Sequence, residues 1–250
     1  MAKGIQGYGK IMDTVKFSKG NTRVIAHRGL SGLEVENTYS SFVAGANRSY
    51  YGIETDIHLS CDGHFVISHD DNFSRLAGDE RKIADMTLDE IQKIILTSKD
   101  ADRDNCAIRP ATLEDYLSVI RRYSKHAVIE LKANFSLDDV SRMIEIVKSY
   151  ASLDDVTFIS FELENLIKVR ELLPHQSVQY LIWHLTDEQI DMLATRKMDA
   201  DVWCVELTKE QIDKAHARGI KVNCWTVNEV ENGEKFASWG IDFITTNILE

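Results

Sequence analysis

The sequence is poor in positive charge, in cysteine and in proline, and each shortage excludes a class of protein. It has 29 Lys and Arg against 40 Asp and Glu, a formal net charge of −11, so it lacks the cations that general nucleic-acid binding requires. Its four cysteines show no CxxC spacing, which argues against a zinc site or a dense disulfide framework. With two prolines and no low-complexity segment, no linker is apparent, and we expect one domain over residues 1–250.

Long apolar runs are also missing. No stretch approaches the ~20 apolar residues of a membrane span, and the opening MAKGIQGYGKIMDTVKF lacks the apolar run of a signal peptide. We therefore expect no membrane span, and the cytoplasm is the expected compartment. A chain of 250 residues with 44% hydrophobic residues can bury a large core without disulfides or metals.

What is present is an alternation of short β-rich runs with longer helical patterns. The runs are rich in Val, Ile and Phe, as strands buried on both faces should be. Several helical patterns start with a capping signal, such as Thr87 followed by Glu90. This alternation predicts an α/β fold, a TIM-type (β/α)8 barrel. The eight expected strands are Arg23–His27, Ile53–Ile57, Ala127–Leu131, Val156–Ser160, Val178–Ile182, Val202–Glu206, Lys221–Trp225 and Asp242–Thr245.

The connection between the second and third expected strands is too long for a simple crossover. It spans about seventy residues, whereas a βα loop usually has ~2–6. Two helical patterns occur within it, near Thr87–Leu96 and Thr112–Tyr123. We interpret residues at about 58–122 as a small insertion into the barrel.

A hairpin signal opens this long connection. The pair Asp62-Gly63 is typical of a tight turn between two strands. We therefore expect an extra strand near Phe65–Ser68 that runs antiparallel to the second barrel strand. Such a return would place His69 beside the acidic residues of that strand.

Three acidic residues lie within apolar strands. Glu54 and Asp56 are two positions apart, so both project to one face of their strand, and Glu130 lies in the strand VIELK. Buried carboxylates are costly unless they are paired or bound to a metal. Oxygen ligands suit Mg²⁺ or Ca²⁺, so these residues predict a metal site. The alternative is that each acid pairs with an Arg or Lys at the barrel rim.

His27 and Arg28 stand at the end of the first expected strand. The carboxyl ends of the strands form the reactive face of a TIM barrel. A histidine there can act as general acid or base, and an arginine can hold a phosphate with two hydrogen bonds. Each residue alone could be structural, but His27 and His69 near one acidic cluster together indicate a catalytic site.

Further residues have two interpretations each. Lys132 should share the face of Glu130, where it could neutralise a phosphate or simply pair with that carboxylate. Trp225 could form a wall of a substrate pocket or pack in the core. His58 and His184 could approach the site, whereas ordinary surface exposure is expected for His64, His126, His175 and His216.

Six segments carry a resemblance to a known family. They are VIAHRG (24–29), ENT (36–38), GIETDIHLSCDGHFVISHD (52–70), VIELK (128–132), VNCWTVN (222–228) and GIDFITTN (240–247). In this order, and covering nearly the whole chain, they resemble the glycerophosphodiester phosphodiesterase family, within the wider group of phospholipase-C-like phosphodiesterases.

The resemblance implies a role for each matching position. It implies a metal bound by Glu54, Asp56 and Glu130, and an acid/base pair made of His27 and His69. It also implies phosphate contacts from Arg28 and Lys132, and a pocket wall at Trp225.

The implied reaction is hydrolysis of a small-molecule glycerophosphodiester, with Mg²⁺ or Ca²⁺, to glycerol 3-phosphate and an alcohol. Two alternatives stay open at this point. One is a related phosphodiesterase acting on lysophospholipids or phosphoinositides. The other is a barrel that binds phosphodiesters without cleaving them.

Overall fold

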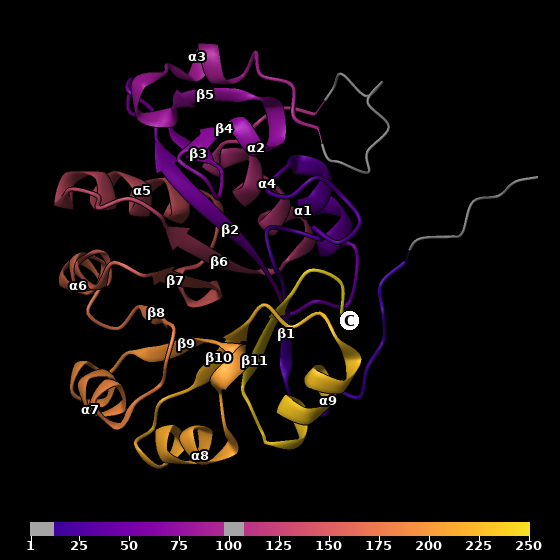
Figure 1. Ribbon diagram of the computed structural model, residues 1–250. Coiled ribbons are helices and arrows are strands. Elements are labelled where there is room, and N and C mark those ends of the chain that lie inside the picture. The colour runs from indigo at the N-terminus through magenta and orange to yellow at the C-terminus, as the bar shows by residue number, and fades with distance from the viewer. Residues whose placement is uncertain (1–12, 98–107) are drawn as a thin grey trace, which may run out of the picture.

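Eight parallel strands form the centre of the molecule and close into a barrel (Figure 1). The computed structural model describes residues 13–97 and 108–250. The barrel closes because the first strand pairs with both the last and the second, and the expected TIM-type fold is confirmed. The barrel strands are β1 (Arg23–Ala26), β2 (Gly52–Leu59), β6 (His126–Leu131), β7 (Val156–Ser160), β8 (Ser177–Ile182), β9 (Asp199–Trp203), β10 (Val222–Trp225) and β11 (Phe243–Thr246).

Helices surround the barrel and bury one apolar face each against it (Figure 1). Several begin with a capping box, as at Thr112 and Asp115, where the hydroxyl and the carboxylate satisfy free amides of the first turn. None of the described helices is both long and apolar enough to cross a membrane. The surrounding helices are α1 (Tyr39–Ala46), α4 (Leu113–Tyr123), α5 (Leu137–Tyr150), α6 (Leu163–Leu172), α7 (Asp187–Arg196), α8 (Lys209–Ala217) and α9 (Val230–Ser238), and a short 3₁₀ turn, η2 (Leu153–Asp155), follows α5.

The sequence prediction of one barrel strand is shifted. We expected a strand at Val202–Glu206, but β9 starts at Asp199 and ends at Trp203, and a 3₁₀ turn, η3 (Cys204–Glu206), follows it. The polar residues Asp199 and Asp201 concealed the start of the strand. Asp201 is nevertheless buried, since it lies on the inner wall of the barrel.

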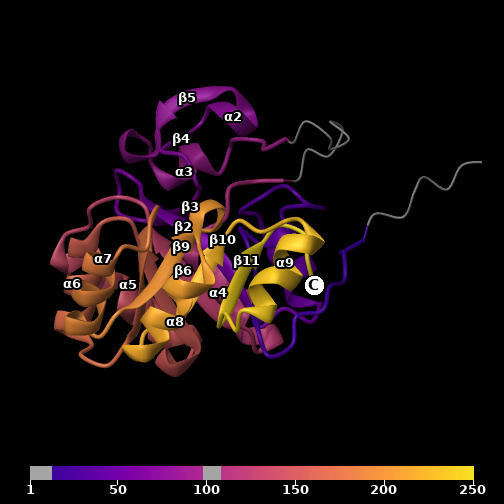
Figure 2. The ribbon, with the colours of Figure 1, turned by 60° about the horizontal axis from the view of Figure 1, so that its bottom comes forward.

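A small subdomain rises above one end of the barrel (Figure 2). Its strand β3 (Phe65–Ile67) pairs antiparallel with β2, as expected, with Ile57 opposite Ile67. Beyond it, a second apolar core forms around Phe73, Ile83 and Met86. The remaining elements are β4 (Asn72–Phe73), α2 (Ser74–Ala77), β5 (Asp79–Lys82), η1 (Ile83–Asp85) and α3 (Leu88–Ile91).

Helix α3 is much shorter than the helix expected at Thr87–Leu96. It ends at Ile91, and the chain then extends so that Leu96 N donates to the carbonyl of Ile108 and Thr97 N donates to that of Leu76. These contacts connect Leu96 and Thr97 to Ile108 and to α2, and they outweigh the helical pattern of the sequence.

Helix α4 confirms the helical pattern at Thr112–Tyr123 and lies on the barrel rather than in the subdomain. Its Tyr116 hydroxyl donates to the carbonyl of Ile53 in β2 at 2.7 Å and accepts from Val128 N in β6 at 3.1 Å. It therefore occupies the position of the crossover helix between β2 and β6. We therefore propose that the insertion is shorter than the expected 58–122 and comprises residues 60–112.

Candidate active site

Three buried carboxylates meet on the inner wall of the barrel. Glu54 and Asp56 come from β2, and Glu130, which is the register partner of Asp56, comes from β6. Their exposed fractions are 2%, 1% and 8%, and one ligand oxygen from each lies within 4.8 Å of the others. The spacing of two along β2 and the pairing of β2 with β6 thus bring the three predicted residues together.

The unused oxygen atoms of this cluster fit a hard cation. Oε2 of Glu54 accepts from the backbone N of Arg28 at 2.6 Å, and Oδ2 of Asp56 accepts from Asn37 Nδ2 at 2.7 Å. Oε1 of Glu54 and Oδ1 of Asp56 are buried and have no hydrogen-bond partner among the described residues. Buried oxygens left without a partner are costly, and carboxylate oxygens are the ligands that Mg²⁺ and Ca²⁺ prefer.

Two cations flank the carboxylates. Nζ of Lys132 lies 2.9 Å from Oε1 of Glu130 and 3.6 Å from Oδ1 of Asp56. Nε of Arg28 lies 3.6 Å from Oδ2 of Asp56. Lys132 therefore does pair with Glu130, as one of its two interpretations expected, and it also lines the same cavity as both histidines.

The carboxylates shift one another's pKa values. Burial, together with the charge of Asp56, raises the pKa of Glu54 well above its usual range and that of Glu130 to about 8. Burial also opposes ionisation of Asp56, but Arg28 and Lys132 outweigh it and hold the pKa of Asp56 below its usual range. Burial and the neighbouring charge thus oppose ionisation of Glu54 and Glu130, and a bound cation would offset this cost.

His27 lies at the end of β1 with one ring nitrogen fixed. Nδ1 is 2.7 Å from Oδ1 of Asn247, and that same oxygen accepts from Ser31 Oγ at 2.9 Å. Because the amide oxygen is an acceptor, Nδ1 carries the hydrogen and Nε2 is left as an acceptor. Removal of the ring from water, together with the charge of Arg28, lowers the pKa of His27 to about 4.

His69 follows β3 and is oriented in a similar way. Its Nδ1 lies 2.9 Å from Oδ1 of Asp70, so that Nε2 is again the free nitrogen. Burial lowers the pKa of His69, although the charge of Asp56 opposes the shift. The antiparallel return of β3 along β2 thus brings His69 to the cavity that His27 lines from β1.

An unusual turn places Arg28 beside the acidic cluster. Arg28 and Gly29 both have positive φ angles, 53° and 75°. A Cβ atom on Gly29 would stand 2.6 Å from the carbonyl carbon of Ser41 at the start of α1. Glycine is therefore required here, because it allows β1 to turn sharply and direct the Arg28 backbone N at Glu54.

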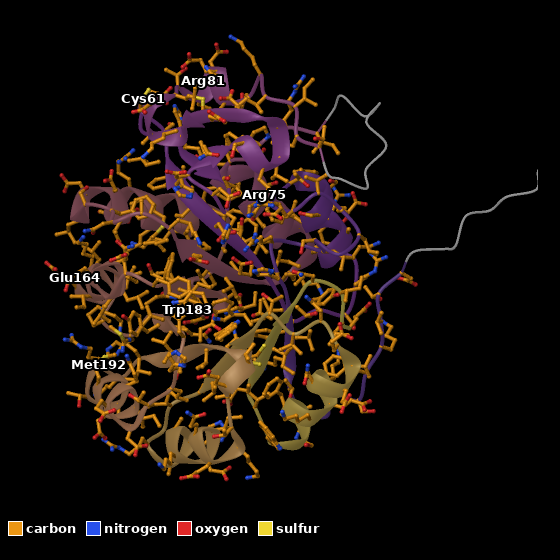
Figure 3. All side chains as sticks on the ribbon, viewed as in Figure 1. Cys61, Arg75, Arg81, Glu164, Trp183 and Met192 are labelled. Carbon is orange, nitrogen blue, oxygen red and sulfur yellow. The ribbon has the colours of Figure 1, made fainter. Side chains whose placement is uncertain are left out.

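Aromatic side chains form the opposite wall of the cavity. Trp225 and Phe161 both line it, with ring centroids 5.6 Å apart and edge to face. Trp183 packs against both and is 52% exposed, and Trp203 packs on Trp183. Figure 3 shows Trp183 over the barrel centre. Trp225 thus lies in the pocket wall, while its packing with neighbouring rings also satisfies the core interpretation.

The other histidines divide between rim and interior. Nε2 of His58 is 3.5 Å from the carbonyl of His69, and His184 is exposed and pairs with Glu206. His126 was expected on the surface, which is wrong. It is half-buried at the start of β6, where Nδ1 meets the Tyr51 hydroxyl and Nε2 meets Thr157 Oγ1.

The structure brings to the site several residues whose role the sequence does not indicate. Asn37 and Asn247 lie within the segments ENT and GIDFITTN, so the resemblance contained them without showing what they contact. Asp201, which lines the cavity, was concealed by the misplaced strand. Arg75 lies outside all six segments, and no local pattern marks it.

Such a barrel, with carboxylates, histidines and cations gathered at the carboxyl ends of its strands, defines a TIM-barrel enzyme suited to an anionic substrate. The chain matches the model of the glycerophosphoryl diester phosphodiesterase family over residues 27–250, and it belongs to that family.

Individual relatives cover nearly the whole chain. A glycerophosphodiester phosphodiesterase of Caldanaerobacter subterraneus subsp. tengcongensis is 28% identical over 235 residues, which are 90% of this chain and 94% of the relative. Among solved structures, a phosphodiesterase of Oleispira antarctica in complex with the product sn-glycerol-3-phosphate superposes with a TM-score of 0.84 and 26% identity, over 90% of this chain and 92% of that one. A glycerophosphodiester phosphodiesterase of Parabacteroides distasonis gives 0.77 and 27%, over 92% and 94%.

Proposed function

We propose that this protein hydrolyses glycerophosphodiesters to glycerol 3-phosphate and an alcohol. The observation that carries the proposal is a buried cluster of Glu54, Asp56 and Glu130, two of which line one cavity with two histidines. Nε2 of each histidine has no hydrogen-bond partner among the described residues. Membership of the family and the product bound to the Oleispira antarctica relative support the same substrate class.

Glu54, Asp56 and Glu130 would hold the divalent cation, Mg²⁺ or Ca²⁺. When bound, this ion withdraws negative charge from the phosphoryl oxygens and so eases attack on an anionic ester. One oxygen of Glu54 and one of Asp56 have no hydrogen-bond partner in the described part of the chain, which supports this assignment.

Four side chains of this protein would act on the diester. Arg28 and Lys132 bind its phosphate and neutralise charge that develops during attack. Of the two histidines, one removes a proton from the nucleophile through Nε2, and the other donates a proton to the leaving alcohol oxygen. Hydrogen bonds from Nδ1 to Asn247 and to Asp70 hold the two rings in the required orientation.

A panel of substrates tests the proposed reaction. Purified protein should release glycerol 3-phosphate from glycerophosphocholine, glycerophosphoethanolamine and glycerophosphoglycerol, and a chelator should abolish the release. Absence of hydrolysis in the presence of Mg²⁺ and of Ca²⁺ would leave a barrel that binds diesters without cleaving them.

One observation favours a second candidate function, hydrolysis of lysophospholipids. The exposed ring of Trp183 extends the apolar wall of Trp225 and Phe161 outward from the cavity, and such a wall could bind an acyl chain. Comparison of glycerophosphocholine with lysophosphatidylcholine as substrates distinguishes the two functions.

A further inference from the structure

A continuous series of hydrogen bonds through charged side chains joins one candidate catalytic histidine to the proposed phosphate-binding arginine. Nδ1 of His69 meets Asp70 at 2.9 Å, and the other oxygen of Asp70 accepts from Nε of Arg75 at 2.8 Å. NH1 and NH2 of Arg75 donate to the two oxygens of Glu36 at 2.8 and 2.7 Å. Glu36 in turn accepts from NH1 of Arg28 at 2.8 Å.

Arg75, in the middle of these contacts, and its partner Glu36 belong to different parts of the fold. Arg75 lies on α2 within the insertion, whereas Glu36 precedes α1 of the barrel. Figure 3 shows Arg75 between the subdomain and the barrel, above the region where β2 runs. The contact of Arg75 with Glu36 therefore connects the insertion, which carries His69, to the barrel, which carries Arg28.

We propose that Arg75 is a positioning residue that acts through Asp70 on the His69 ring and through Glu36 on the Arg28 guanidinium. This inference rests on the proposed function of His69 and Arg28. Arg75 itself does not line the cavity. Its effect is to fix the two acidic residues that hold the groups in contact with the phosphate.

The geometry requires an arginine. Nε is bonded to Asp70 while both terminal nitrogens are bonded to Glu36, so the planar guanidinium uses three of its donors in fixed directions. A lysine has one nitrogen and cannot hold both carboxylates in this way. Because Arg75 carries a charge between two acids, its removal also leaves Asp70 and Glu36 without their shared cation.

Stability alone does not account for these contacts. The Arg75 side chain is 44% exposed, so water screens its ion pairs and limits what they add to stability. The effect of orientation on rate is larger, since displacement of a reacting group by about 1 Å can lower a rate by roughly 10²-fold. A large effect of Arg75 on rate with a small effect on stability is thus the signature of a positioning role.

The insertion offers a matched control in Arg81. Its side chain is 53% exposed and forms ion pairs with Asp79 and Glu90, both in the insertion. Figure 3 shows Arg81 at the outer end of the subdomain, away from Arg75. Arg75→Met and Arg81→Met remove the same side-chain chemistry from the same subdomain, but only the first interrupts the connection to His69 and Arg28.

The test compares kcat, KM and Tm of Arg75→Met and Arg81→Met, on glycerophosphocholine and on a nitrophenyl phosphodiester, in wild-type and His69→Ala backgrounds. We expect Arg75→Met to lower kcat on the order of 10²-fold, and Arg81→Met to leave it within about twofold, with similar small shifts in Tm. In the His69→Ala background the loss from Arg75→Met should shrink, because the ring that Arg75 positions is gone.

Equal kcat losses from Arg75→Met in both backgrounds, or no loss at all, would overturn the proposal. If Arg75→Met lowers Tm much more than Arg81→Met does, Arg75→Lys is measured as a second variant. A reduced kcat of Arg75→Lys with a wild-type Tm supports the positioning role, and a wild-type kcat of Arg75→Lys refutes it. Failure of the proposed function is seen separately, as wild-type protein that cleaves the nitrophenyl diester but none of the glycerophosphodiesters.

Discussion

The side chain of Asn37 holds one oxygen of Asp56 and leaves the other, Oδ1, without a hydrogen bond among the described residues. Nδ2 donates to Oδ2 of Asp56 at 2.7 Å, while Oδ1 of the same amide accepts from the Thr55 hydroxyl at 3.0 Å. Thr55 therefore fixes the orientation of the amide. Asn37 adopts a φ of 56°, which asparagine tolerates better than most residues, and this turn brings its side chain under β2.

Asn37→Gly should weaken divalent-metal binding about 10- to 100-fold, the usual effect of losing a group that orients a ligand. Glycine keeps the positive φ, so the change removes the two side-chain hydrogen bonds and tolerates the turn. Isothermal titration calorimetry with Mg²⁺ and with Ca²⁺ measures the metal affinity. Ser124→Gly, also at positive φ but at the end of α4, is the control and should bind metal as the wild type does. Unchanged affinity in Asn37→Gly would show that Asp56 needs no orientation.

Glu54→Gln and Glu130→Gln should each reduce metal affinity and activity, since a neutral amide replaces a charged oxygen ligand. Wild-type activity should disappear with EDTA and return with added Mg²⁺ or Ca²⁺, and the variants should need more metal for half-maximal rate. Activity that survives thorough chelation would assign the three acids a structural role instead.

His27→Ala and His69→Ala should each lower kcat by ~10²–10⁴-fold, which is the usual contribution of a positioned proton donor or acceptor. The double variant should lose less than the product of the two, because the pair acts as a unit. A nitrophenyl leaving group hardly needs a proton donor, so it should restore the rate of one single variant and not the other. Near-wild-type rates of both single variants on glycerophosphocholine would refute the pair.

Acid should destabilise the fold through His126, which is not part of the carboxylate cluster. Burial lowers the pKa of this ring to about 4, below its ordinary value of about 6.5. Between these pH values the unfolded chain binds a proton there and the folded chain does not, so stability falls as pH drops. Thermal unfolding from pH 7 to pH 4.5 should show a shallower decline of Tm in His126→Gln, while the exposed-site variant His175→Gln should follow the wild type.

Trp183→Ala tests how far the substrate extends along the aromatic wall. If the diester is a glycerophosphodiester of a small alcohol, kcat/KM should change by less than about tenfold, since the ring lies outside the cavity lining. A much larger loss on lysophosphatidylcholine than on glycerophosphocholine would favour the second candidate function. Tyr39→Ala, which removes a ring of similar exposure from the start of α1, should affect neither substrate.

The barrel could be predicted because its strands carry a strong local signal. Apolar runs such as Ile53–Ile57 and Ala127–Leu131 correspond to β2 and β6 within a few residues. The signal failed where function or burial of polar groups changed the composition, as in β9, where Asp199 and Asp201 take the place of apolar residues. Helix α3 failed for another reason, because a contact between Leu96 and Ile108 determines the chain path there.

The cluster of acids was predictable because period-two spacing and strand pairing are regular. Glu54, Asp56 and Glu130 needed only the rule that alternate residues share a face and that neighbouring strands pair. The contacts that orient the site were not predictable in this way. Asn37 reaches Asp56, and Asn247 reaches His27, from loops whose paths depend on the complete fold.

The bidentate contact between Arg75 and Glu36 also affects whether the insertion can be exchanged between members of this enzyme family. His69, Asp70 and Arg75 all belong to the insertion and would be transferred together in a chimaera that exchanged this segment between relatives. Glu36 would stay behind with the barrel. A grafted insertion can thus contain His69, Asp70 and Arg75 and still lack the carboxylate that Arg75 binds. Compatibility of donor and recipient therefore depends on one acidic residue outside the exchanged segment.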